Sequence, residues 1–172
     1  MKRRQYVRSI GGLVGIGMLA GCSGGGSNDD ESEEAGPTVD MVTDGGEYYF
    51  DPIGLFVEPG TTVTFNNHSG SHSATAYVDG LEEAETTRIP DGGPEFNTGI
   101  LTQEGATETV TFDTEGTYDY YCIPHKTLEM VGRIVVGSPG GPAEGSMPPD
   151  GDVPDSSTIV DSESISYTEF QG

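Results

Sequence analysis

The chain has 172 residues and a formal net charge of −22, with 29 acidic residues, seven basic residues and two cysteines. This acid excess excludes a basic surface for nucleic acid, and the length suits one domain with flexible ends. Self-repulsion of this size destabilises a compact domain unless salt screens it, and the screening length at 1 M salt is about 3 Å. The composition therefore indicates a halophilic source.

The first 21 residues predict an export signal. Arg3 and Arg4 form a twin arginine followed by an aromatic and an aliphatic residue, which resembles a Tat signal. The apolar run that follows is about twelve residues long, whereas a membrane-spanning helix needs roughly 20. It ends in LAGC, which resembles a lipobox whose Cys22 becomes lipid-modified. We therefore expect a lipid-anchored protein on the outer face of the cytoplasmic membrane.

Residues 22–37 are rich in Gly, Ser and acidic residues, which predicts a flexible, hydrated tether. Residues 38–137 then form one predicted all-β domain, of about the size of a β-sandwich. Short period-two or β-branched runs, bounded by turn residues, predict its strands. The predicted strands are Glu47–Phe50, Leu55–Val57, Thr61–Asn66, Ser73–Tyr77, Thr107–Phe112, Thr117–Cys122 and Val131–Val136.

Two segments carry no strong strand pattern. Residues 79–101 are acidic and loop-like, and no function follows from their sequence. Residues 138–172 form a low-complexity tail of Gly, Pro, Ser and acidic residues, for which we predict disorder. The alternative is that Thr158–Phe170 contains a late strand on a sheet edge.

A Cys–His–Met motif lies between the last two predicted strands. Cys122, His125 and Met130 have the spacing C-x2-H-x4-M. Together with a second imidazole, a thiolate, an imidazole and a thioether are the ligands of a blue-copper electron-transfer site. Pro124 stiffens the loop because its ring fixes φ. Cys122 is also the one cysteine outside the lipobox, and a free thiol in an exported protein is a liability unless it is used.

The remaining ligand must come from another strand, and two histidines, His68 and His72, follow the predicted strand Thr61–Asn66. Zinc is the alternative metal. Because a thioether is a poor zinc ligand, that alternative would require a harder donor, for which Glu129 is the candidate.

These motifs resemble the plastocyanin family, and within it the haloarchaeal halocyanin-like proteins. The resemblance covers residues 47–136 and is carried by VEPGTTVTFNN, His72, GTYDYYCIPH and MVGRIVV. It implies a Greek-key cupredoxin sandwich with one copper ion. The family places four residues between the Asn pair and the first ligand, which favours His72 and leaves His68 facing water.

The resemblance implies that His72, Cys122 and His125 hold copper in one plane and that Met130 is a weak axial ligand. It implies electron transfer at the His125 edge, with Lys126 orienting a partner. Expected partners are a cytochrome bc-type or other quinol-oxidising donor and a terminal oxidase or nitrogen-oxide reductase acceptor. Such contacts are small and transient, and we expect a monomer.

Two residues depart from the family pattern. Ser71 and Ser73 replace the Pro and Asn that commonly flank the first ligand histidine, so we expect different hydrogen bonds around the metal. Two other functions remain open, copper storage or delivery and a small copper enzyme. Four protein ligands would leave no open position for a substrate, which disfavours the enzyme.

Overall fold

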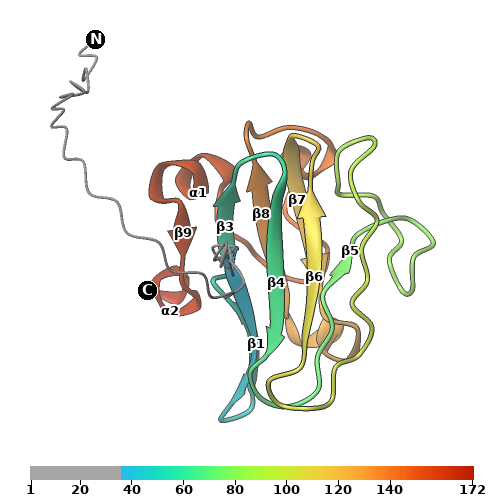
Figure 1. Cartoon of the computed structure of the whole chain (residues 1–172), viewed down its shortest axis with the longest axis vertical. Coiled ribbons are helices and arrows are strands. Elements are labelled where there is room, and N and C mark those ends of the chain that lie inside the picture. Colours follow the sequence, from blue (N-terminus) through green and yellow to red (C-terminus); the bar gives the residue numbers. More distant parts are fainter. Residues whose placement is uncertain (1–35) are drawn as a thin grey trace, which may run out of the picture. The chain divides into compact units, whose positions relative to one another are not determined.

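The fold is described from a computed structural model that covers residues 36–172. Arg3, Arg4, Cys22 and most of the predicted tether lie outside the described residues. Two sheets form a sandwich, with strand orders β2-β1-β4-β6 and β5-β7-β8-β3-β9 (Figure 1). The predicted all-β sandwich is therefore confirmed. None of the helices formed by residues 36–172 has the length and apolarity that crossing a bilayer requires.

The strands, in chain order, are β1 Thr38–Asp44, β2 Glu47–Asp51, β3 Gly54–Val57, β4 Thr61–Asn67, β5 Thr75–Ala76, β6 Thr107–Phe112, β7 Gly116–Tyr121, β8 Val131–Val136 and β9 Ser164–Ile165. The seven predicted runs all contribute strands, although the run Ser73–Tyr77 retains only two strand residues. Sequence reasoning missed β1, which pairs parallel with β4 and antiparallel with β2.

Aromatic side chains fill the space between the two sheets. Phe50, Phe65 and Phe96 surround the ring of Tyr120, with centroids 4.6, 5.5 and 6.0 Å from it. Their planes are inclined by 64°, 74° and 57° to the ring of Tyr120, an arrangement that adds to the stabilisation from buried area. Because β4 alternates inward and outward residues, it has one face in this core and one toward solvent.

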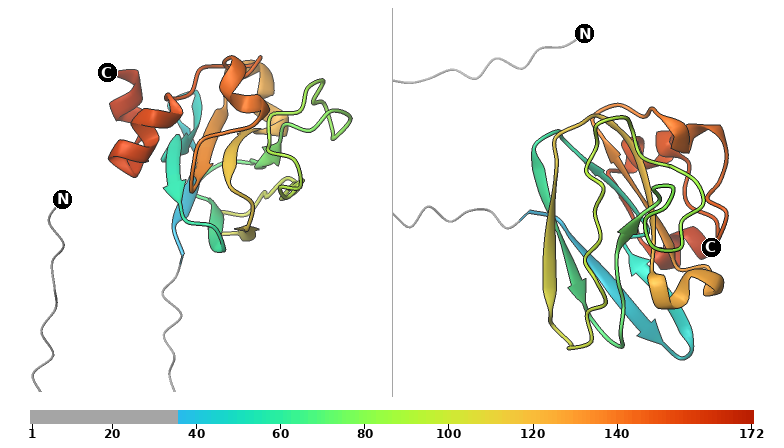
Figure 2. Two further views of the ribbon diagram at one scale, coloured as in Figure 1. Left: turned by 90° about the horizontal axis from the view of Figure 1, so that it is seen from above. Right: turned by 90° about the vertical axis from the view of Figure 1, so that its right-hand side faces the viewer.

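Strands β7 and β8 behave differently, because every residue of both is buried. The cause is the C-terminal segment, residues 138–172, which covers the outer face of their sheet (Figure 2). This segment contains η2 Pro142–Gly145, α1 Ser156–Ser162, β9 and α2 Tyr167–Gln171. Our prediction of disorder there is wrong, and the alternative of a late edge strand is the better description, since β9 pairs with β3.

A buried ion cluster holds this segment in place. Asp119 in β7 is fully buried and accepts hydrogen bonds from Arg88 Nε at 2.9 Å and Arg133 Nε at 2.7 Å. Both guanidinium groups also donate to the carbonyl of Ala143, at 3.0 and 3.2 Å. Arg133 reaches Pro154 O at 3.3 Å as well. The two arginines therefore satisfy backbone carbonyls of a segment whose composition alone predicts no order.

Asp119→Asn tests this cluster. The substitution leaves two buried guanidinium groups facing a neutral amide, so we expect a loss of roughly 3–5 kcal/mol in the free energy of unfolding. Urea titration in molar salt measures it without changing the ionic strength. Asp113→Asn, at an exposed position before β7, is the matched control and should change stability by at most about 0.5 kcal/mol. A loss below about 1 kcal/mol for Asp119→Asn would contradict the cluster's role.

Candidate metal centre

Three donor side chains from two separate segments meet at one end of the sandwich. The sulfur of Cys122 lies 3.6 Å from His72 Nδ1 and 3.4 Å from His125 Nδ1. The two Nδ1 atoms are 3.1 Å apart. His72 and Cys122 are fully buried, whereas His125 is partly exposed. The structure therefore brings together three of the four residues predicted to bind the metal.

The loop that follows β7 positions two of these donors. Cys122 precedes the 3-10 helix η1, Ile123–Leu128, which has Pro124 in its first turn. His125 N donates to Cys122 O at 3.2 Å, and Cys122 N donates to Met130 O at 3.1 Å. Met130 is fully buried in the same apolar cluster as Cys122. The loop is thus closed on itself before it enters β8.

Thr43 lies on β1, the strand that the sequence analysis did not predict, and it orients the ring of His72. Its Oγ1 lies 2.9 Å from His72 Nε2. Since Nδ1 faces the sulfur, the assigned tautomer carries its proton on Nε2 and donates it to Thr43. Gly70 makes room for this contact, because a Cβ there would lie 2.4 Å from Thr43 Oγ1. The alternation of buried Val39 and Met41 was the signal that could have predicted this strand.

Ser73 connects the two ligand-bearing segments. Its backbone N–H points at Cys122 Sγ, 3.4 Å away, and its Oγ accepts a hydrogen bond from Ile123 N at 2.8 Å. We expected different hydrogen bonding here because Ser73 replaces the family's Asn. The side chain differs, but a hydrogen-bonded link between the two loops is present.

Tyr48 covers the exposed side of the cluster. Its ring stacks on that of His125, with centroids 3.9 Å apart and planes inclined by 17°. No local sequence pattern predicts this contact, because it depends on the register of β2 against β1. Since Tyr48 is itself partly exposed, the two stacked rings together form the surface nearest the cluster.

The other sequence candidates lie elsewhere. His68 is exposed in the loop after β4 and outside the donor group, as expected. Glu129, the alternative zinc ligand, is exposed and also outside that group. Lys126 donates to Glu83 O at 2.6 Å and lies 3.7 Å from Asp150 Oδ2. Its ammonium group is therefore held against the protein's own surface.

Burial controls the protonation of these donors. It raises the pKa of the Cys122 thiol to about 11. Burial first, and the proximity of His125 second, lower the pKa of His72 to about 4, and burial also lowers that of His125. Without a metal, burial thus favours the neutral thiol and the neutral imidazoles. The lone pairs of the sulfur and of the two Nδ1 atoms then point toward one another. A soft cation would use those lone pairs and displace the thiol proton, so the donor set fits copper.

Comparisons with known proteins agree with this chemistry. The family model for copper-binding proteins of the plastocyanin/azurin family matches residues 37–137. Halocyanin from Natronomonas pharaonis is 29% identical over 171 residues, covering 79% of this chain and 98% of halocyanin. Plastocyanin from Scenedesmus fuscus is 30% identical over 99 residues, covering 58% and 97%. The crystal structure of pseudoazurin from Methylobacterium extorquens AM1 matches with a TM-score of 0.52 and 25% identity, covering 74% and 95%.

Thr43→Val tests how His72 is held. Valine keeps the shape but removes the acceptor, which leaves a buried N–H without its partner and should cost about 1–3 kcal/mol of unfolding free energy in the metal-free protein. Thr43→Ser keeps the hydroxyl and should retain most of the stability. A loss for Thr43→Ser together with no loss for Thr43→Val would show that the methyl group, and not the hydrogen bond, stabilises this contact.

Proposed function

We propose that this chain, which belongs to the plastocyanin/azurin family of copper-binding proteins, carries single electrons on one type 1 copper ion between membrane redox complexes. The observation that supports this most is the convergence of His72, Cys122 and His125 in a largely buried cluster. One buried metal ion held by residues of two loops suits reversible one-electron transfer, since little needs to move when the charge changes.

In this proposal His72, Cys122 and His125 would hold the copper ion, and Met130 would supply a fourth, weaker donor. Copper supplies the one-electron Cu(II)/Cu(I) couple. The chain's own residues keep the donors in place. Ser73 donates toward the sulfur and ties the two loops, while closure of the loop between Cys122 and Met130 limits its motion. Full burial of the thiol keeps water away from the sulfur.

Electrons leave and enter, in this proposal, through the edge of His125 and the Tyr48 ring stacked on it. This is the part of the cluster nearest the surface, which favours short-lived contacts with a partner. The donor would be a cytochrome bc-type complex or another quinol oxidiser. The acceptor would be a terminal oxidase or a nitrogen-oxide reductase, and the carrier would act as a monomer.

The place of action is also a proposal. The twin arginine Arg3 and Arg4 and the lipobox at Cys22 support Tat export and a lipid anchor on the outer membrane face. The similarity to a halocyanin agrees with such a location, and the acid excess agrees with a medium of molar salt. The tether before the domain would let the copper end move between membrane partners.

The first test is colour. Copper-loaded protein should be deep blue, with narrow copper hyperfine splitting in its EPR spectrum, because the thiolate transfers charge to Cu(II). Cys122→Ser should abolish both features. His72→Ala should lose or distort the colour, whereas the control His68→Ala should retain it. A colourless Cu(II) form of the unmodified protein would refute the electron-carrier assignment.

The second test concerns Met130. A thioether stabilises Cu(II) slightly more than Cu(I), so Met130→Leu should raise the reduction potential while the colour persists. Met130→Gln supplies a harder oxygen donor and should lower the potential. Voltammetry of the three proteins in one high-salt buffer measures the order. If both variants change stability without this order of potentials, Met130 only packs the loop.

The third test concerns the anchor. With Cys22 lipidated, the protein should fractionate with membranes, and Cys22→Ala should release it or leave it held by an uncleaved signal. Mass spectrometry of the mature N-terminus separates these two outcomes. Fully soluble, lipid-free wild-type protein would refute the anchor.

A further inference from the structure

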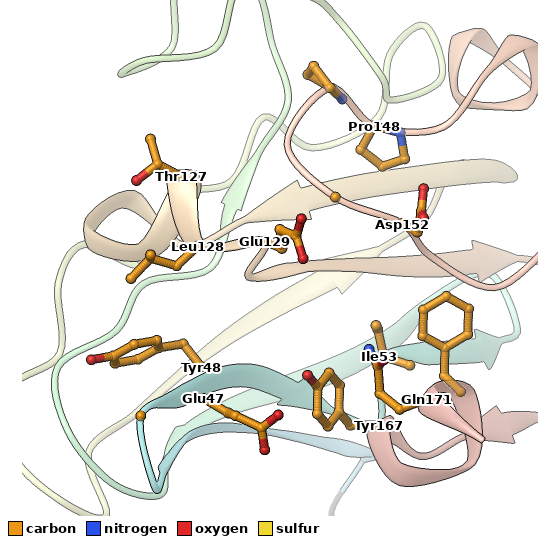
Figure 3. Close-up of a pocket in the computed structure, with 14 residues that line it drawn as sticks. Glu47, Tyr48, Ile53, Thr127, Leu128, Glu129, Pro148, Asp152, Tyr167 and Gln171 are labelled. Atoms are coloured by element: carbon orange, nitrogen blue, oxygen red, sulfur yellow. The ribbon is translucent and has the colours of Figure 1, made fainter.

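The C-terminal segment and the metal-binding loop enclose a groove of about 840 Å³. Figure 3 shows Glu47, Tyr48 and Tyr167 along one wall and Leu128, Glu129 and Asp152 along the other. Half of this lining comes from residues 138–172, which lie beyond the part of the chain that the copper-binding family model matches. The groove is therefore a feature that the family match does not account for.

We propose that this groove is a docking site for a basic, extended segment of a redox partner protein, with lysine or arginine side chains lying between the carboxylates and the aromatic rings. The inference rests on the proposed electron-carrier function and names the chemistry of the partner for that function.

Charge is the first argument. Glu47, Glu129 and Asp152 are exposed carboxylates in the groove lining, and no basic residue of the described chain lines it. Burial raises the pKa of the Tyr167 hydroxyl, and the charges of Glu47 and Glu129 raise it further. The negative charges of Glu47 and Glu129 therefore add up inside the groove, since the two residues lie on opposite walls of it. This favours a positively charged occupant.

The basic residues of the described chain cannot neutralise these groups. Arg88 and Arg133 are buried against Asp119 on the covered face of the sheet. Lys126 is held by the carbonyl of Glu83 and lies near Asp150. Residues 36–172 therefore supply no positive charge of their own that complements the groove.

The aromatic rings are the second argument. Tyr48, Tyr167 and Phe170 line the groove and are partly exposed. Rings attract ammonium and guanidinium groups and also pack against their alkyl stems. These contacts are short in range, whereas attraction between distant charges is largely lost in molar salt. A groove that combines both kinds of group can thus select a basic segment even at high salt.

The groove walls are fixed before any partner binds. Tyr167 stacks on Tyr49, with centroids 4.1 Å apart and planes inclined by 6°. Gly151 lies so close to the metal-binding loop that a Cβ would be 2.9 Å from Val131 Cγ2 and 3.2 Å from Glu129 O. A preformed surface loses little conformational entropy on binding.

The position of the groove gives docking a consequence for electron transfer. Tyr48 lines the groove and also stacks on His125, so it contacts both an occupant and a proposed copper ligand. A basic segment seated there would bring its redox protein against the Tyr48 side of the cluster.

The test uses ¹⁵N-labelled, Cu(I)-loaded protein titrated with a hexalysine peptide. Amide shifts should concentrate at Glu47, Tyr48, Leu128, Glu129 and Asp152. Shifts spread over the whole acidic surface, or centred on another face, would overturn the proposal. Because the map is measured on the unmodified protein, no variant needs to fold for this outcome to be decisive.

A charge-matched pair of triple variants separates the groove from general acidity. Glu47→Gln, Glu129→Gln and Asp152→Asn together should raise the Kd for hexalysine at least about tenfold. The control places the same three charge losses in exposed turns at the far end of the sheets, at Glu58, Asp113 and Glu115. It should change the Kd less than about twofold. Equal weakening by both triples would show attraction by net charge alone and would overturn the site.

Tyr167 tests the aromatic contribution in 2 M NaCl. Tyr167→Phe keeps a ring face and should bind hexalysine as the unmodified protein does, whereas Tyr167→Ala should weaken binding about twofold to fivefold.

Failure of the docking site can be told apart from failure of the carrier function. A blue protein with a reversible couple but no groove shifts refutes the groove alone, while a colourless Cu(II) form refutes the carrier and leaves the peptide map unchanged.

Discussion

The carboxylate of Asp119 is the group on which most of this architecture depends. It lies on β7, the strand that leads directly into Cys122, and it pairs with Arg88 and Arg133 in the interior. Removing three charges from water is costly, and the cost is offset only because backbone carbonyls complete the hydrogen bonding. Those carbonyls belong to the C-terminal segment, so one buried cluster couples that segment to the strand that carries the thiol. The strand is consequently buried on both faces.

This double-sided burial defines the environment of the proposed copper ligands. With β7 and β8 fixed on both faces, the loop between Cys122 and Met130 has both ends anchored. The histidines are held by contacts from other parts of the fold, His72 by Thr43 and His125 by the ring of Tyr48. Side chains oriented before the metal binds lose little entropy on binding, and they resist rearrangement when the charge of the metal changes.

The strands and the donor set could be predicted because each rests on local pattern. Alternation of inward and outward residues marks β4, and the spacing of Cys122, His125 and Met130 is compact. The missing parts depend on long-range geometry. Strand β1 pairs parallel with β4 across a long connection, and its threonine and acidic residues resemble the tether before it. The C-terminal segment is ordered by the buried arginine cluster, and no local sequence pattern distinguishes a buried arginine from an exposed one.

The use of the arginines also explains the surface. Two of the three basic residues in the described chain face inward and the third is held to a neighbouring loop, so the exposed charges of residues 36–172 are almost all acidic. At low salt such a surface repels other acidic surfaces, because like charges oppose contact. The surface can still bind some proteins in preference to others through groups that touch them directly. In molar salt that discrimination depends on groups in direct contact, and the groove beside His125 brings carboxylates and aromatic rings together at the distance where they act.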